Sequence, residues 1–95
     1  MKPEELLQEL ESIATALGIT IRYEKGDFHG GFCILRDERM IVINRKLTLQ
    51  RKVSVLARSL GEFGTDSVFI KPAVRQFIED EMARAAASRY EKEEQ

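Results

Sequence analysis

The sequence predicts a small α+β domain in which one helix, three strands and two further helices follow one another. Three segments repeat apolar residues every three or four positions, as amphipathic helices do, and a stretch between the first two carries short apolar or alternating runs that favour strands. The chain has 95 residues, 43% of them hydrophobic and 33% charged, which is typical of one globular domain. We therefore expect a single domain over residues 1–95, whose charged tail frays from about residue 90.

The first predicted helix has clear boundaries. Pro3 suits the first helical turn, Glu4 and Glu5 complement the positive end of the helix dipole, and Gly18 suits a helix end. The apolar positions of this segment fall on one side of the helix, and polar residues fall opposite. The apolar stripe consists of Leu6, Leu7, Leu10, Ile13, Ala14 and Leu17.

Three strands are predicted after this helix. Residues 19–24 alternate apolar and polar side chains, which is the pattern of a half-buried strand. The β-rich runs 32–35 and 40–43 are joined by 36–39 and favour a hairpin, while 25–31 interrupts regular structure. We expect the three strands to form one antiparallel sheet.

Two further helices are predicted in the second half of the chain. Thr48 can cap the first of them, which ends at Gly64, and Pro72 suits the first turn of the other. Their apolar stripes are Leu49, Val53, Leu56, Ala57, Leu60 and Phe63 in one helix, and Val74, Phe77, Ile78, Met82 and Ala85 in the other. We expect all three helices to pack on one face of the sheet and to bury Leu10, Ile21, Ile34, Leu56, Leu60 and Phe77.

The sequence favours a cytoplasmic protein that does not span a membrane. Its longest uninterrupted apolar runs, 32–35 and 40–43, are far shorter than the roughly 20 residues that cross a bilayer. The N-terminus lacks the basic start and apolar block of a secretory signal. The single cysteine, Cys33, cannot form an intramolecular disulfide, so nothing requires an oxidising compartment.

The charges are segregated along the chain, although the net charge is only −1. Residues 36–58 contain seven basic and two acidic side chains, whereas both ends of the chain are acidic. This layout predicts neutralisation between segments of one chain or of two copies, so we expect a protein partner or self-association as a homodimer. A nucleic-acid-binding surface formed by the basic segment 36–58 is the alternative.

His29 and Cys33 are the only histidine and cysteine of the chain, and Gly30 and Gly31 lie between them. A nucleophilic cysteine needs a base held by a third group, and a zinc site needs at least three protein ligands; the sequence offers neither set near these residues. We therefore expect turn-forming glycines and a small buried thiol on the same strand face as Leu35. A metal- or thiol-dependent hydrolase is the alternative.

Two charged residues of the last helix are further candidates. Arg75 lies in the first turn, where it could hold an anion together with free backbone amides, but an ion pair with Glu79 one turn later is the interpretation we favour. Glu81 falls within the apolar stripe, which is an unusual place for a carboxylate unless it meets a cation or extends past the core.

Several short motifs resemble those of a family of short, uncharacterised bacterial proteins. These motifs are Gly-Gly-Phe-Cys at 30–33, Ile-Asn-Arg-Lys-Leu at 43–47, Val-Leu-Ala at 55–57 and Phe-Ile-Lys-Pro-Ala-Val-Arg at 69–75. The resemblance extends over most of the chain and implies no function.

A second resemblance concerns the helix that follows the strands and Ile43-Asn44. Residues 57–62, Ala-Arg-Ser-Leu-Gly-Glu, are similar to the Ala-His-Glu-Leu-Gly-His segment of minimal zincin metallopeptidases, such as those that cleave phage repressors. In that family the two histidines bind zinc and the glutamate acts as general base. Arg58, Ser59 and Glu62 replace these three residues, so the resemblance implies a zincin-like fold without the zinc ligands.

Because an arginine keeps its proton, Arg58 excludes zinc from the position of the first histidine. The last helix would supply the third zinc ligand in that family. We therefore expect Arg58 to form an ion pair there with Glu79, Asp80 or Glu81.

The sequence contains no complete catalytic or cofactor-binding set. We therefore expect a non-catalytic protein-interaction or regulatory module that needs no metal or cofactor and binds a protein partner or itself. The residues that remain candidates for ligand or partner contact are His29, Gly30, Gly31, Cys33, Arg58, Glu62, Arg75 and Glu81.

Overall fold

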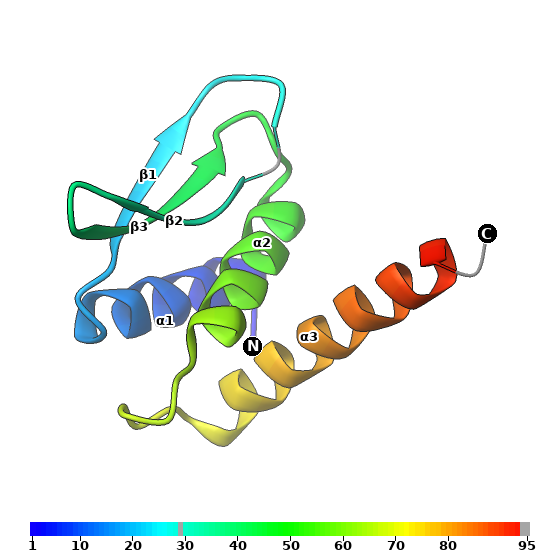
Figure 1. Cartoon of the computed structure of the whole chain (residues 1–95). Coiled ribbons are helices and arrows are strands. Elements are labelled where there is room, and N and C mark those ends of the chain that lie inside the picture. Colours follow the sequence, from blue (N-terminus) through cyan, green and yellow to red (C-terminus); the bar gives the residue numbers. More distant parts are fainter. Residues whose placement is uncertain (29, 94–95) are drawn as a thin grey trace.

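The computed structural model describes residues 1–28 and 30–93, with the side chains of 1–28 and 30–88. The predicted α+β class and element order are confirmed (Figure 1). The elements are α1 (Pro3–Ala16), β1 (Thr20–Glu24), β2 (Gly30–Leu35), β3 (Glu38–Asn44), α2 (Leu49–Phe63) and α3 (Pro72–Glu93). Fraying was expected from about residue 90, but α3 continues to Glu93; residues 94 and 95 lie outside the described part.

The sheet is mixed, so the prediction of an antiparallel sheet was wrong for its first strand. The strand order is β1-β3-β2, with β1 parallel to β3 and β2 antiparallel to β3. The chain leaves β1, crosses to the far edge as β2 and returns between the two as β3 (Figure 1). Parallel neighbours need such a crossover, which a sequence of consecutive short strands does not reveal.

Asn44, at the end of β3, holds the crossing segment in place. Its side-chain amide donates hydrogen bonds to the carbonyl oxygens of Gly26 (2.8 Å) and Phe28 (2.6 Å), and its Oδ1 accepts one from the backbone N–H of Lys46 (3.0 Å). Asn44 is buried, so these three bonds satisfy a polar group that would otherwise be costly. They also tie two loops to the same strand end.

The predicted hairpin between β2 and β3 is confirmed, but its turn is shorter than expected. The strands extend to Leu35 and Glu38, so only Arg36 and Asp37 connect them. Both residues have positive φ values, 52° and 66°, which is the backbone of the two-residue turns that match the twist of paired strands.

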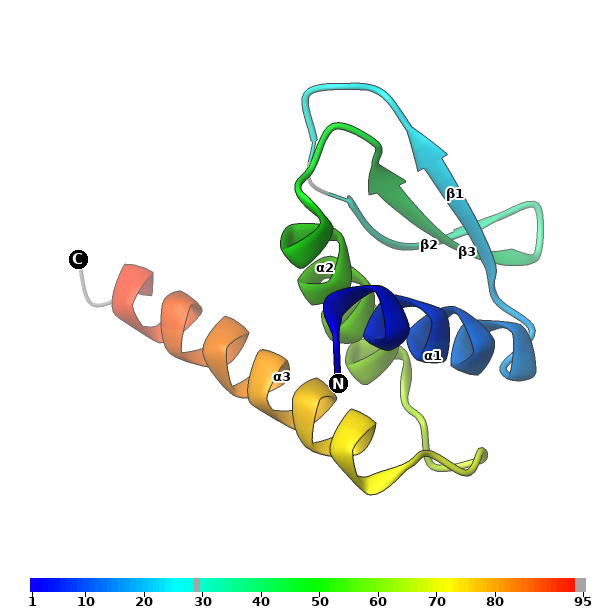
Figure 2. The same ribbon diagram turned by 180° about the vertical axis from the view of Figure 1, so that it is seen from behind.

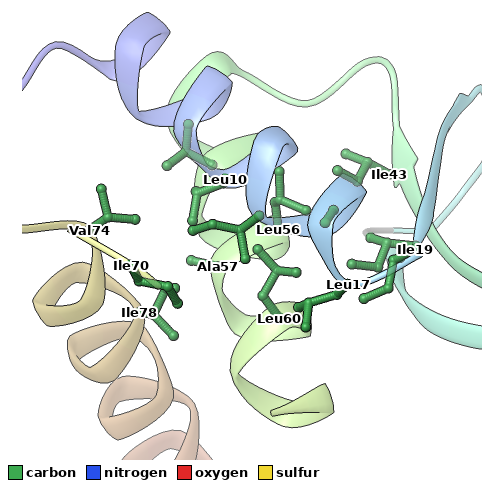
Figure 3. Close-up of a cluster of buried hydrophobic side chains, with 14 residues drawn as sticks. Leu10, Leu17, Ile19, Ile43, Leu56, Ala57, Leu60, Ile70, Val74 and Ile78 are labelled. Carbon is green, nitrogen blue, oxygen red and sulfur yellow. The ribbon is translucent and has the colours of Figure 1, made fainter. Parts of the chain in front are cut away.

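The core lies between the sheet and the helices α1 and α2, which cover one face of the sheet, and it continues between these helices and α3 (Figures 1 and 3). Leu10, Leu56 and Leu60 are buried as predicted, whereas Ile21 and Phe77 are half-buried against the core. The prediction for Ile34 was wrong, because it lies near the hairpin turn where no helix covers the sheet, and it is 66% exposed. The largest fully buried side chains are Leu10, Ile41, Ile43, Leu56, Leu60 and Val74.

The last helix, α3, does not pack on the sheet as expected; in the described residues it contacts α2 and α1 only, because α2 lies between it and the strands. Helices α2 and α3 approach closely at Gly61, where an added Cβ would lie 2.6 Å from Met82 Cγ and 3.2 Å from Ile78 Cγ2. The C-terminal turns of α3 extend away from the other elements (Figures 1 and 2). No helix within the described ranges, α3 included, is long and apolar enough to cross a membrane.

Candidate functional site

The face of the sheet opposite the helices is the candidate site. The strand register places Cys33 beside Met40 and Arg22 beside Val42, on the side away from Ile41 and its buried neighbours. None of the described helices packs on this side, so it is open to a partner (Figures 1 and 2). We call it the open face.

A hollow of about 430 Å³ lies on the open face. It is mostly apolar, and two exposed large hydrophobic side chains, Phe28 and Leu35, line it; Ile34 borders it, but its register with Arg39 turns its side chain to the covered side. Clustered exposure of this kind is uncommon on a surface that contacts only water. The full lining is Arg22, Glu24, Lys25, Phe28, Cys33, Ile34, Leu35, Met40 and Val42.

The rim of the open face carries both signs of charge. Arg22 and Glu24 form an ion pair of 3.2 Å along β1. At the hairpin end, Glu38 accepts a 2.9 Å hydrogen bond from the hydroxyl of Thr20. Lys25 lies beyond the other end of β1, and Arg36 accompanies Asp37 and Glu38 at the hairpin end, so both ends of the face carry both signs of charge.

The cysteine on this face is exposed, which corrects the prediction of a buried thiol. Cys33 does share its strand face with Leu35, as expected, but that face is the open one. Its thiol lines the hollow. The neighbouring candidate His29 lies outside the described residues.

Gly30 and Gly31 begin β2 and have a packing role. Gly30 has φ = 133°, and a Cβ there would overlap the carbonyl oxygen of Val42 and lie 3.2 Å from Val55 Cγ1. Gly30 therefore lets the start of β2 fit between β3 and α2. A Cβ on Gly31 would meet no atom within 4 Å.

The expected ion pair between Arg58 and an acid of α3 is not formed. Arg58 and Glu62 are exposed, and neither forms an ion pair with a described residue. Ser54, one helical turn before Arg58, is the α2 residue that meets Glu81. The carboxylate is therefore displaced along the helix from Arg58, and Arg84 of its own helix neutralises it.

The expected Arg75–Glu79 ion pair is also absent among the described side chains. An exposed pair of this spacing contributes only about 0.2 to 0.5 kcal/mol, which does not fix two flexible side chains. Arg75 is half-buried and Glu79 is exposed. Instead, Lys71 pairs with Glu9 at 2.7 Å and links the start of α3 to α1.

Glu81 is the charged residue with the most unusual environment. It is only 2% exposed, and its Oε1 accepts hydrogen bonds from the Ser54 hydroxyl (3.3 Å) and from Arg84 Nη1 (2.8 Å). Of the two alternatives that the sequence left open for this carboxylate, contact with a cation is the one observed, although the cation is Arg84 and not Arg58. The sequence did hold a signal for the cation, because Arg84 follows Glu81 at the i, i+3 spacing of helix neighbours.

The basic segment 36–58 does not gather into one surface. Arg36 and Arg45 lie beyond opposite ends of β3, whose seven residues span about 23 Å. Between them, the Arg39 guanidinium stacks over the Phe63 ring, with 5.4 Å to the ring centroid. Lys52 lies over the ring of Tyr23, so part of this charge packs within the molecule.

Sequence reasoning missed the apolar residues of the open face, namely Phe28, Met40 and Val42. A signal was present, because the run 40–43 is apolar at every position, and alternation then places apolar side chains on both faces of a strand. Among the described residues, no three His, Cys, Asp or Glu side chains gather as a metal site would require. Comparison with protein-family models, curated proteins and solved structures finds no match for this chain.

Proposed function

We propose that this protein is a non-catalytic interaction module that associates with a second copy of itself through the open face. The observation that carries the proposal is the clustering of Phe28 and Leu35 around one hollow, beside Met40 and Val42, on a sheet face that no described helix covers. Burial of such a cluster removes apolar area from water, which is the main driving force of association. A domain of this size also gains stability from any additional buried surface.

The distribution of charge favours a second copy over a strongly charged partner. A two-fold axis perpendicular to the strands stacks two open faces with their strands antiparallel. The hairpin end of one copy, where Arg36 accompanies Asp37 and Glu38, then lies over the end of the other copy that carries Lys25 and the Arg22–Glu24 pair. Neither end carries a large net charge, so the two copies meet without strong repulsion and the apolar hollows meet between them.

The resemblance to minimal zincins fits the same proposal. A domain of that kind with Arg58, Ser59 and Glu62 at the ligand and base positions would retain the framework and act through its surface. The matching alanine and leucine of this segment are buried, and the glycine packs against α3, so all three serve the packing of α2.

Sedimentation equilibrium of the wild-type chain and of Leu35→Lys tests the proposal. Leu35 is 55% exposed, so the substitution leaves the core intact while it places a charge in the interface. We expect a wild-type dimer at micromolar concentration and a dissociation constant at least about tenfold higher for Leu35→Lys. Phe69→Ser is the matched control, because Phe69 is 87% exposed and lies outside the open face.

Alkylation of Cys33 provides an independent measurement. The thiol lines the hollow, so dimerisation should slow its reaction with iodoacetamide as the protein concentration rises. The proposal fails if the wild-type chain is monomeric at high micromolar concentration, or if Leu35→Lys and Phe69→Ser dimerise equally well. A monomer whose apparent affinity for DNA falls steeply with salt would support the nucleic-acid alternative instead.

A further inference from the structure

A second cavity lies where the three helices meet, on the opposite side of α2 from the sheet. It has a volume of about 360 Å³, within the range of small-molecule sites. The start of α1, the first half of α2 and the middle of α3 form its walls. Its lining is Met1, Pro3, Leu6, Gln50, Val53, Ser54, Phe77, Glu81 and Arg84.

The carboxylate of Glu81 is the buried polar group of this cavity. Its side chain is 3% exposed, and Oε1 accepts both of its hydrogen bonds, from Ser54 and Arg84. Oε2 forms no hydrogen bond with a described residue. Every fully buried side-chain nitrogen or oxygen of the described part has a hydrogen-bond partner, so Oε2 is not fully buried, and Glu81 lines the cavity.

Arg84 leaves Oε2 available to another cation. The Arg84 side chain is 70% exposed and reaches Oε1 from the solvent side. A carboxylate has about four acceptor positions, of which Oε1 uses two and Oε2 none. Because Oε2 is accessible and has no donor among the described residues, a ligand that supplies donors can form hydrogen bonds with it, and a positive charge on the ligand adds attraction.

The rest of the lining determines the kind of ligand. Leu6, Val53 and Phe77 provide apolar walls, and the Gln50 side chain provides an amide oxygen. We propose that this cavity binds a small molecule that carries a protonated primary amine on a compact apolar body. The ammonium group donates to Glu81 Oε2 and to the Gln50 amide, while the apolar body lies against the three hydrophobic side chains.

Calorimetric titration with phenethylamine and with phenethyl alcohol tests the site. The two compounds share an apolar body and differ in the cation, so the amine should bind at least about tenfold more tightly. The variant Glu81→Gln keeps the shape of the side chain and removes its charge, and should reduce this preference to near equality. Glu79→Gln is the matched control, because Glu79 is exposed on the same helix, and it should retain the preference.

The location of binding is measured separately, so that the result does not depend on the folding of Glu81→Gln. Amide NMR shifts of the wild-type chain on titration with the amine should change around Gln50, Ser54 and Glu81 and remain constant around Gly18. The proposal is overturned if the amine and the alcohol bind equally to the wild-type chain, if neither binds, or if the shifts lie elsewhere. The dimer measurements concern a different surface and are unaffected by either outcome.

Discussion

The two faces of β3 show how similar side chains acquire different roles. Ile41 and Ile43 point toward α1 and α2 and are fully buried, whereas Met40 and Val42 point away from every helix. Met40 is nevertheless buried, because its neighbours on the flanking strands surround it, and Val42 is half-buried. The sheet thus carries one face that the chain covers itself and one that is apolar at its centre and left uncovered.

Substitutions of two adjacent residues, one on each face, should show the largest difference in the free energy of unfolding. Ile41→Ala removes three carbons from the covered face and should lower the free energy of unfolding by about 2 to 5 kcal/mol. Val42→Ala on the open face should cost about 1 kcal/mol, because water already reaches part of the side chain. Denaturant unfolding of the monomer measures both, and equal losses would mean that the open face is buried in the monomer.

Asn44→Ala should have the next largest effect and lower the free energy of unfolding by about 1 to 3 kcal/mol. The substitution leaves the carbonyl groups of Gly26 and Phe28 without their donor, and it removes the acceptor for Lys46 N–H. Since the segment between β1 and β2 borders the open face, the loss should also weaken dimerisation. Chemical denaturation and hydrogen exchange of residues 25–28 measure the effect; unchanged exchange there would show that other contacts hold the segment.

The smallest effect concerns Tyr23, on the covered face of β1. Burial, the 2.9 Å hydrogen bond that it donates to Glu11 Oε2 and the negative charge of Glu11 all raise the pKa of Tyr23 above its usual value of about 10. Because the folded state holds the proton more tightly, stability is unaffected below the unfolded pKa and falls as the pH rises above about 10. Tyr23→Phe should show a weaker fall in that range, and an identical pH dependence would contradict this account.

The helices were the most predictable part of the fold because their signals are local. Pro3 and Pro72 begin two of them, and the Thr48 hydroxyl accepts a hydrogen bond from Arg51 N–H as a capping residue does. The sheet topology was not predictable in this way. It depends on Asn44, whose partners Gly26 and Phe28 are distant in sequence, and an asparagine in a strand gives no sign of which carbonyl groups it will meet.

The candidate sites depended still more on tertiary placement. The sequence left open whether Glu81 meets a cation or extends past the core, and it named Arg58 as the cation. The actual partner is Arg84, because α3 is offset along α2 so that Glu81 meets Ser54 and not Arg58. Similarly, the β-rich runs predicted strands without indicating which face the helices would cover. Cys33 and Ile34 were both expected to be buried, but Cys33 lies on the open face, and Ile34 is exposed because helical cover ends near the hairpin.

The strand order β1-β3-β2 has a consequence for the folding of the growing chain. Ribosomes release β1 before β2 and β3, yet β1 has hydrogen-bonding partners in the sheet only in β3. The β2–β3 hairpin joins neighbouring residues and can form quickly, whereas the pairing of β1 with β3 must close a loop that contains all of β2. Helix α1 and strand β1 are therefore synthesised before their partner strand, and β1 can pair in the sheet only after β3 has been completed at Asn44.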